Sequence, residues 1–142
     1  MKISIKGFTA IARFEGYRQQ AYRCPSGVWT IGYGHTEGVK KGDTISYREA
    51  TDLLHKDIEK SEKVVEQCGE LTQGQFDALV SLVFNVGETN FNKSTLKEKV
   101  LNNRYDQTIG DEFRKWVFSK GRKLEGLVKR REWEARRYYE NN

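Results

Sequence analysis

Apolar residues near the start of the chain recur every three or four positions, as on one face of a helix: Ile5, Phe8, Ile11 and Ala12. The pattern predicts a short helix over residues 4–14. Gly16 follows it, and glycine is the residue that most often comes directly after a helix C-terminus. Glu15 is therefore expected at the end of this helix and not in its middle.

Residues 21–38 have a different, β-type pattern. In "CPSG", residues 24–27, proline and glycine occupy the second and fourth positions of a type I turn. The following "VWTIGYGHT" is rich in β-branched and aromatic residues, and Gly32 and Gly34 alternate within it. We expect a small β-hairpin that closes near Gly38, with its glycines where a ligand or another backbone comes close.

The pattern becomes helical again at Ser46. Ser46 and Glu49 form a capping box, and the apolar stripe behind them predicts a helix of about 30 Å. Thr72 and Gln75 begin a second, very apolar helix, which Gly87 ends and which we expect in the core. Further helices are predicted over residues 94–102, 106–119 and 124–140.

These elements predict an α+β fold that is mostly helical and forms a single domain over residues 1–142. A small lobe of about residues 15–45 contains the β-hairpin. A larger helical lobe covers about residues 70–142, with the first helix packed near it, and a helix of about residues 46–67 connects the two. A ligand site is expected in the cleft between the lobes.

Composition and charge limit the classes of function that fit this chain. The net charge is +5, and "KGRKLEGLVKRREWEARR" near the end is rich in Lys and Arg, which favours a polyanionic partner such as nucleic acid or an anionic cell wall. The interleaved Glu125, Glu132 and Glu134 weaken the nucleic-acid interpretation and favour a solvated helix face with i,i+4 pairs. No apolar run reaches the length of a membrane span, and the first residues lack the apolar core of a signal peptide.

The two cysteines, Cys24 and Cys68, match no zinc-binding pattern, and nothing in the sequence favours a bridge between them. Cys24 instead stands out with Glu15 and Thr30, which lie on either side of it. The turn can fold Cys24 and Thr30 back toward the helix end that carries Glu15. A carboxylic acid there can protonate a leaving oxygen while a hydroxyl holds a water, as glycosidases require.

This spacing resembles the catalytic pattern of the phage-type lysozymes, the endolysins of glycoside hydrolase family 24: Glu, eight residues, Asp or Cys, five residues, Thr. The segments "FEG", "TIGYGHT", "LTQGQFDALVSLVFNVG", "FNKSTL" and "GLVKRREWE" extend the resemblance over essentially the whole chain. It implies a lysozyme-like two-lobed fold and a bacteriolytic muramidase. Such an enzyme hydrolyses the β-1,4 bond between N-acetylmuramic acid and N-acetylglucosamine and needs no cofactor or metal.

The resemblance also implies roles for individual residues. Glu15 matches the general acid, and Thr30 matches the residue that positions the attacking water or supports the site. Cys24 occupies a position that is Asp or Cys in the family. Because a thiol ionises less readily than a carboxyl group, the stereochemical outcome, retaining or inverting, stays open.

Other positions are expected around this centre. His35 is expected to support the site by hydrogen bonding across the hairpin, and Arg130 or Arg131 to pair with a carboxylate near it. The resemblance implies sugar contacts at three positions: Thr36, Phe84 and Ser94. Peptidoglycan strands are the expected partner, with no nucleic acid, no membrane insertion and a monomeric protein.

Four alternatives remain at this point. A lytic transglycosylase cleaves the same bond with a single acid. Cys24 and His35 are also compatible with a cysteine peptidase or amidase. A basic module that only binds nucleic acid or the wall, or a catalytically inactive wall-binding relative, is compatible with the composition. A muramidase made in the cytoplasm without a signal peptide would reach the wall after release, through a membrane lesion made by a separate holin-type protein.

Overall fold

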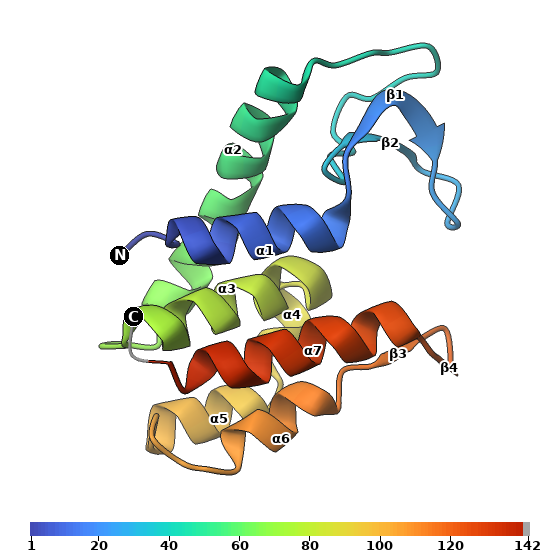
Figure 1. The fold of residues 1–142 in the computed structure, drawn as a ribbon. Coiled ribbons are helices and arrows are strands. Elements are labelled where there is room, and N and C mark those ends of the chain that lie inside the picture. Colours follow the sequence, from blue (N-terminus) through green and yellow to red (C-terminus); the bar gives the residue numbers. More distant parts are fainter. Residues whose placement is uncertain (141–142) are drawn as a thin grey trace. The chain divides into compact units, whose positions relative to one another are not determined.

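A computed structural model of the chain describes residues 1–140. In this range it contains seven helices: α1 (Ile5–Glu15), α2 (Tyr47–Glu66), α3 (Gln73–Val86), α4 (Glu88–Asn92), α5 (Thr95–Asn102), α6 (Ile109–Arg114) and α7 (Glu125–Tyr138). Four strands form two small antiparallel sheets (Figure 1): β1 (Arg18–Arg23) with β2 (Trp29–Gly32), and β3 (Phe118–Ser119) with β4 (Arg122–Lys123). The mostly helical α+β class is confirmed.

The chain forms two compact units. The smaller unit consists of residues 9–60, and the larger one of residues 1–8 together with the chain from residue 61 onward. Two helices, α1 and α2, contribute residues to both units. Each unit is described separately below.

The sheet of the smaller unit is built around the predicted turn. Gly27 N donates to Cys24 O at 2.8 Å, and Cys24 N donates to Val28 O at 3.0 Å, so the "CPSG" turn joins β1 directly to β2. Gly27 has a φ of 87°, which glycine adopts without strain. The turn and the hairpin are therefore confirmed.

After Gly38 the chain pairs with β1 a second time, which the sequence did not predict. It returns along β1, where Ala21 N donates to Asp43 O and Ile45 N donates to Gln19 O, both at 2.9 Å. The segment "VKKGDTI" lacks the alternating apolar pattern of a strand, and its two hydrogen bonds lie beside a single bridge. Because of this, the sequence did not predict the segment, which we call the third edge of the sheet.

Helix starts follow the capping prediction. Ser46 Oγ accepts from Glu49 N and Glu49 Oε1 accepts from Ser46 N, both at 3.1 Å, one residue before α2 begins. Thr72 and Gln75 form the same reciprocal pair at the start of α3. Each box satisfies backbone donors that the helix itself leaves free.

Helix α3 lies in the core of the larger unit, next to α7 (Figure 1). All residues from 74 to 83 are buried, as expected for a helix that is apolar nearly all round. The two helices come so close at one end that a Cβ on Gly74 would collide with the carbonyl oxygens of Arg137 and Glu140. The predicted core helix is confirmed, and Gly87, with a φ of 90°, ends it.

The predicted helix over residues 106–119 is wrong at both ends. Only α6, Ile109–Arg114, is helical, and β3 and β4 form a tight hairpin further along. At its turn Lys120 and Gly121 have φ values of 51° and 78°, the left-handed pair that a two-residue hairpin turn requires. Lysine seldom adopts that conformation, so this turn could not be predicted from the residue types. The short helix α4 was also not predicted.

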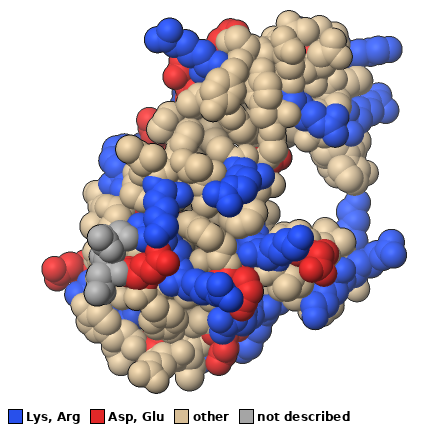
Figure 2. Space-filling view, viewed as in Figure 1, with Lys and Arg blue, Asp and Glu red and all other residues tan. Residues whose placement is uncertain are grey.

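Most Lys and Arg residues at the basic end of the chain are exposed, as the interpretation from composition expected, but three arginines are buried. Arg130, Arg131 and Arg137 are at most 4% exposed. Arg131 Nε lies 2.7 Å from Glu134 Oε1, and Arg130 Nε lies 3.5 Å from Glu134 Oε2. On the face shown in Figure 2, the remaining Lys and Arg side chains are scattered among acidic and uncharged residues.

Buried carboxylate partners explain why these arginines can be buried. Burial raises the pKa of the Glu134 carboxyl, and the two neighbouring guanidinium groups act against that rise. Ser81 Oγ also donates to Glu134 Oε2 at 2.5 Å. Arg137 binds Asp77, which is fully buried, at 2.8 Å. Charged groups with such partners tolerate burial, whereas single ones do not.

Candidate active site

Glu15 is the last residue of α1, as predicted. Gly16 N donates to Ala12 O at 3.0 Å, and Gly16 has a φ of 73°, so the chain leaves the helix directly after the glutamate. A residue at a helix end is not surrounded by further turns of its own helix. Its side chain can therefore reach a neighbouring segment.

That neighbouring segment is the glycine turn that follows β2. A Cβ placed on Gly34 would lie 2.8 Å from Glu15 Oε1, closer than real Cβ contacts come. The turn is closed by Ile31 and His35, whose backbones exchange two hydrogen bonds of 2.9 Å. Gly34 also has a φ of 82°. Both the backbone conformation and the carboxyl group above it therefore require glycine at this position.

Cys24 follows β1 directly and its thiol is partly exposed. The Ser26 hydroxyl, whose Oγ lies 2.8 Å from Cys24 Sγ, is the main cause that lowers the pKa of the thiol to about 7. Burial opposes the shift and is the next-largest effect, and the backbone N–H groups of Ser26 and Val28 lower the pKa further. A large fraction of this thiol is therefore ionised at neutral pH, as a nucleophile or an electrostatic stabiliser requires.

Thr30 lies on β2 and is 4% exposed. Its hydroxyl donates to Val28 O at 3.0 Å, yet it also contributes to the lowered pKa of Cys24. A hydroxyl has one proton, so it cannot serve both acceptors at once. The proton is bound to Val28 O while Cys24 is a thiol and can turn to the thiolate when one forms. The structure thus brings Cys24 and Thr30 together.

His35 connects the glycine turn to α2. Its Nδ1 lies 2.7 Å from Asp57 Oδ2, and its Nε2 lies 3.0 Å from Glu37 O. The ring therefore bonds to α2 and to its own loop, not across the hairpin as the sequence suggested. Because both ring nitrogens have oxygen partners and neither is bonded to Cys24, the geometry gives no support to a Cys24–His35 catalytic pair.

The three positions proposed for sugar contact fall in different units. Thr36 is exposed beside His35 in the smaller unit, whereas Phe84 and Ser94 belong to the larger unit. Phe84 is partly exposed near the end of α3. Ser94 caps α5, since its Oγ accepts from Lys97 N at 3.0 Å and donates to Phe91 O at 2.6 Å. This structural role explains the serine without a ligand.

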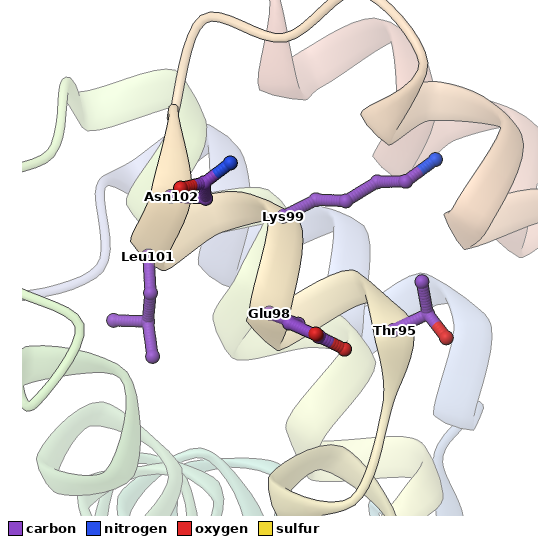
Figure 3. Close-up of a pocket in the computed structure, with 5 residues that line it drawn as sticks. All are labelled: Thr95, Glu98, Lys99, Leu101 and Asn102. Atoms are coloured by element: carbon purple, nitrogen blue, oxygen red, sulfur yellow. The ribbon is translucent and has the colours of Figure 1, made fainter.

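A hollow of about 630 Å³ on α5 contains none of the predicted site residues. It is lined by Thr95, Glu98, Lys99, Leu101 and Asn102, whose side chains diverge from the helix (Figure 3). The Lys99 ammonium group is already bound to Glu112 and Thr108. The candidate site stays at Glu15, Cys24 and Thr30, as the sequence predicts.

Sequence reasoning missed two partners in this region. Ser26 lies in the turn two residues after Cys24, where a serine is an ordinary turn residue, so its effect on the thiol gave no signal. Asp57 did give a signal, because it is a carboxylate on the apolar stripe of α2. A charged residue at such a position generally has a buried or half-buried partner, here His35.

Known proteins resemble this chain in sequence and in fold. The family model described as phage lysozyme matches residues 12–134. The chain belongs to the phage lysozyme family. It is 43% identical over 140 residues to the endolysin of Acyrthosiphon pisum secondary endosymbiont phage 1, which covers 94% of this chain and 95% of that protein.

Two further relatives extend the comparison. The endolysin of Bacillus phage B103 is 41% identical over 139 residues, and the match spans 94% of this lysozyme but only 52% of that protein. The solved muramidase domain of SpmX from Asticaccaulis excentricus has a TM-score of 0.89 and 36% identity, with 98% of both chains covered. The resemblance read from the catalytic spacing is thus confirmed at the level of family and fold.

Family membership makes this lysozyme a glycosidase that breaks down the bacterial cell wall. None of the helices in the described part of the chain combines the length and the apolar character that crossing a membrane requires.

Proposed function

We propose that this lysozyme hydrolyses the β-1,4 bond between N-acetylmuramic acid and N-acetylglucosamine, with Glu15 as the general acid. The observation that carries the proposal is the close approach of Glu15 to Gly34, where a Cβ would lie only 2.8 Å from Glu15 Oε1. A carboxyl group at a helix C-terminus gains nothing from the helix dipole. The missing side chain at Gly34 leaves room for the Glu15 carboxyl group itself to lie against the turn.

In the first step Glu15 donates its proton to the glycosidic oxygen as the bond from that oxygen to the muramic-acid C1 breaks. Positive charge then develops at C1 and the ring oxygen. A Cys24 thiolate stabilises this charge, either through space or by forming a C1–S bond. The lowered pKa of Cys24 supports the ionised form that both routes need.

On the route through a C1–S bond, water attacks C1 in the second step, the C1–S bond breaks to return the thiolate, and Glu15, now a carboxylate, accepts the proton of the water. On the direct route, water attacks C1 from the face opposite the leaving group and the Cys24 thiolate accepts its proton. We propose that the Thr30 hydroxyl orients this water or holds the thiolate in place. If a C1–S bond forms first, two inversions give net retention, whereas direct attack by water gives inversion. The anomeric configuration of the first product, read by NMR within minutes of cleavage, separates the two routes.

Other residues complete the proposed site. His35, held by Asp57, would keep the glycine turn in the conformation that Glu15 faces. Thr36, Phe84 and Ser94 are proposed to contact the sugar chain, following the family resemblance. The partner is the peptidoglycan strand, and we propose that the enzyme acts as a monomer.

The names of the relatives support a role in host lysis. Several are endolysins of bacteriophages. We propose that this lysozyme is made in the cytoplasm and reaches the wall after release, through a lesion made by a separate holin-type protein. Expression alone should then leave host cells intact, and permeabilising the inner membrane should start lysis at once. Lysis by the lysozyme alone would contradict the proposed route.

The test of the reaction compares wild-type protein with Glu15→Gln on purified peptidoglycan. We expect new reducing ends with the wild type and a loss of at least about 100-fold with the variant, the order seen when a general acid is removed. New peptide amines without reducing ends would mean an amidase or peptidase. Activity in Glu15→Gln close to that of the wild type would remove Glu15 from the mechanism.

A further inference from the structure

A second hollow lies on the sheet of the smaller unit, and none of the proposed catalytic residues lines it. Its volume is about 290 Å³, and its lining comes from β1, β2 and the turn before the third edge: Gln20, Ala21, Trp29, Lys41, Gly42 and Asp43. All of these residues belong to residues 9–60. The hollow can therefore be described within one compact unit.

Trp29 lines this hollow, whereas Thr30, the next residue of β2, does not. In the pairing of β1 with β2, Trp29 is opposite Arg23 and Thr30 is opposite Tyr22. Successive residues of a strand point to opposite faces, so Trp29 and Thr30 project in opposite directions. A ligand on Trp29 would not compete with one held at Thr30.

The walls of the hollow are fixed by hydrogen bonds. Lys40 N donates to Asp43 Oδ2 at 2.8 Å, and Asp43 N donates to Lys40 O at 3.1 Å, which closes the turn. Ala21 N donates to Asp43 O at 2.9 Å and attaches the turn to β1. On the strand side, the Arg23 guanidinium lies 5.3 Å from the centre of the Trp29 indole ring. The site is thus largely formed before a ligand arrives.

The polar groups of the hollow are available to a ligand. Within the described residues, four side-chain groups make no hydrogen bond to the protein: the Trp29 indole N–H, the Gln20 amide, the Lys41 ammonium and Asp43 Oδ1. They include both donors and acceptors, arranged around an aromatic ring. An aromatic surface with a few convergent polar groups is suited to a sugar ring, whose C–H face packs on the indole while its hydroxyl and acetamido groups form hydrogen bonds.

We propose that this hollow is a second, non-catalytic saccharide site that binds one amino-sugar ring of a peptidoglycan strand; the choice of strand rests on the function proposed above. The volume of about 290 Å³ lies just below the roughly 300–1,000 Å³ typical of pockets for drug-sized ligands, which suits a single ring. Lys41 and Arg23 complement the carboxylates that peptidoglycan carries. Binding there would keep the enzyme on an insoluble wall between cleavage events by raising its local concentration.

The first experiment observes the indole N–H signals of the three tryptophans by NMR, in Glu15→Gln protein so that the ligand is not consumed. The Trp29 signal is identified by its loss in Trp29→Phe. Titration with the tetramer of N-acetylglucosamine should shift this signal in a saturable way. A Trp29 signal that does not move at millimolar tetramer would overturn the proposal.

A matched pair of variants distinguishes binding in the hollow from nonspecific attraction by positive charge. Lys41→Ser and Lys40→Ser each remove one exposed positive charge from adjacent positions, but only Lys41 lines the hollow. We expect Lys41→Ser to weaken tetramer binding at the Trp29 signal several-fold and Lys40→Ser to leave it unchanged. Equal effects of the two variants, or a Trp29 shift produced only by a phosphate-containing wall polymer, would contradict a saccharide site.

The second experiment measures retention on insoluble wall. Trp29→Leu in the Glu15→Gln background should bind purified sacculi roughly tenfold more weakly, as expected for loss of an aromatic anchor. Failure of this proposal and failure of the proposed function are distinguishable. If the Trp29 signal of the wild-type protein shifts with saccharide but no reducing ends are released, the saccharide site is supported and the muramidase activity is contradicted. If cleavage is normal but the Trp29 signal does not shift, the muramidase activity is supported and the saccharide site is contradicted.

Discussion

Glu15 Oε1 lies 2.8 Å from the place that a Cβ would take on residue 34, so Gly34 and the carboxyl group depend on each other. The relationship joins the end of α1 to the turn after β2. It suggests that the glycine is needed for the site and not only for the turn.

Gly34→Ala tests this directly, and Gly38→Ala is its matched control. Both glycines have positive φ values, 82° and 73°, but a Cβ on Gly38 would meet nothing within 4 Å. Both variants should lose about 1–2 kcal/mol of stability from backbone strain. Only Gly34→Ala should also lose most of its activity, because Glu15 must move. Equal activities in the two folded variants would contradict the role given to this contact.

The second prediction concerns Cys24 and pH. Thiolate forms as the pH rises through the pKa of about 7, so activity should rise over the same range. Ser26→Ala removes the main group that stabilises the thiolate, and the pKa should move up toward its ordinary value. The rise in activity should then occur at higher pH. Thiolate absorbance measured against pH gives the pKa independently, in a Cys68→Ser background to leave one thiol.

Two replacements of Cys24 accompany this profile. Cys24→Ala should lose most of the activity, whereas Cys24→Asp should keep a substantial part and lose the rise near pH 7, since a carboxyl ionises at lower pH. An alanine variant with undiminished turnover would remove Cys24 from the mechanism.

Asp57→Ala tests the support of the glycine turn. The variant leaves His35 Nδ1 without its partner, and the pair is only 16% and 28% exposed. We expect a loss of about 1 kcal/mol, which thermal unfolding would detect as a fall of a few degrees in Tm. Asp52→Ala, an exposed carboxylate on the same helix, should change Tm little. A fall of the same size in both would show that the His35 bond contributes nothing.

The fourth prediction concerns two neighbouring glutamates of α7. Glu134 is fully buried against Arg131, whereas Glu132 pairs with Arg114 at a site where the two side chains are 39% and 47% exposed. Glu134→Ala should cost about 3–5 kcal/mol, because it leaves guanidinium groups buried without their partner. Glu132→Ala should cost less than about 1 kcal/mol. Urea unfolding of both variants measures the difference, and similar values would contradict the buried pairing.

Local signals explain what could be predicted from the sequence. The capping pairs Ser46–Glu49 and Thr72–Gln75 each involve residues three apart, so the sequence shows them completely. Gly16 likewise identified Glu15 as the end of a helix. The alternating glycines predicted the close approach of a ligand or another backbone, and near Gly34 the group that approaches is instead the Glu15 side chain.

Long-range contacts explain what could not be predicted. Arg137 is buried because Asp77, sixty residues earlier, is its partner, and no local pattern shows that pairing. The hairpin at residues 118–123 depends on a left-handed Lys120, which propensity does not favour. The acidity of Cys24 depends on how the turn places the Ser26 hydroxyl. In each case the deciding feature is a three-dimensional contact or an unusual backbone conformation.

The most direct test of the central claim is mass spectrometry of purified peptidoglycan digested in water enriched in oxygen-18. If Glu15 and Cys24 direct hydrolysis, each new muramic-acid reducing end will carry one oxygen-18 atom, and Glu15→Gln will produce none. Anhydro-muramic ends without the label would show a transglycosylase and contradict the account.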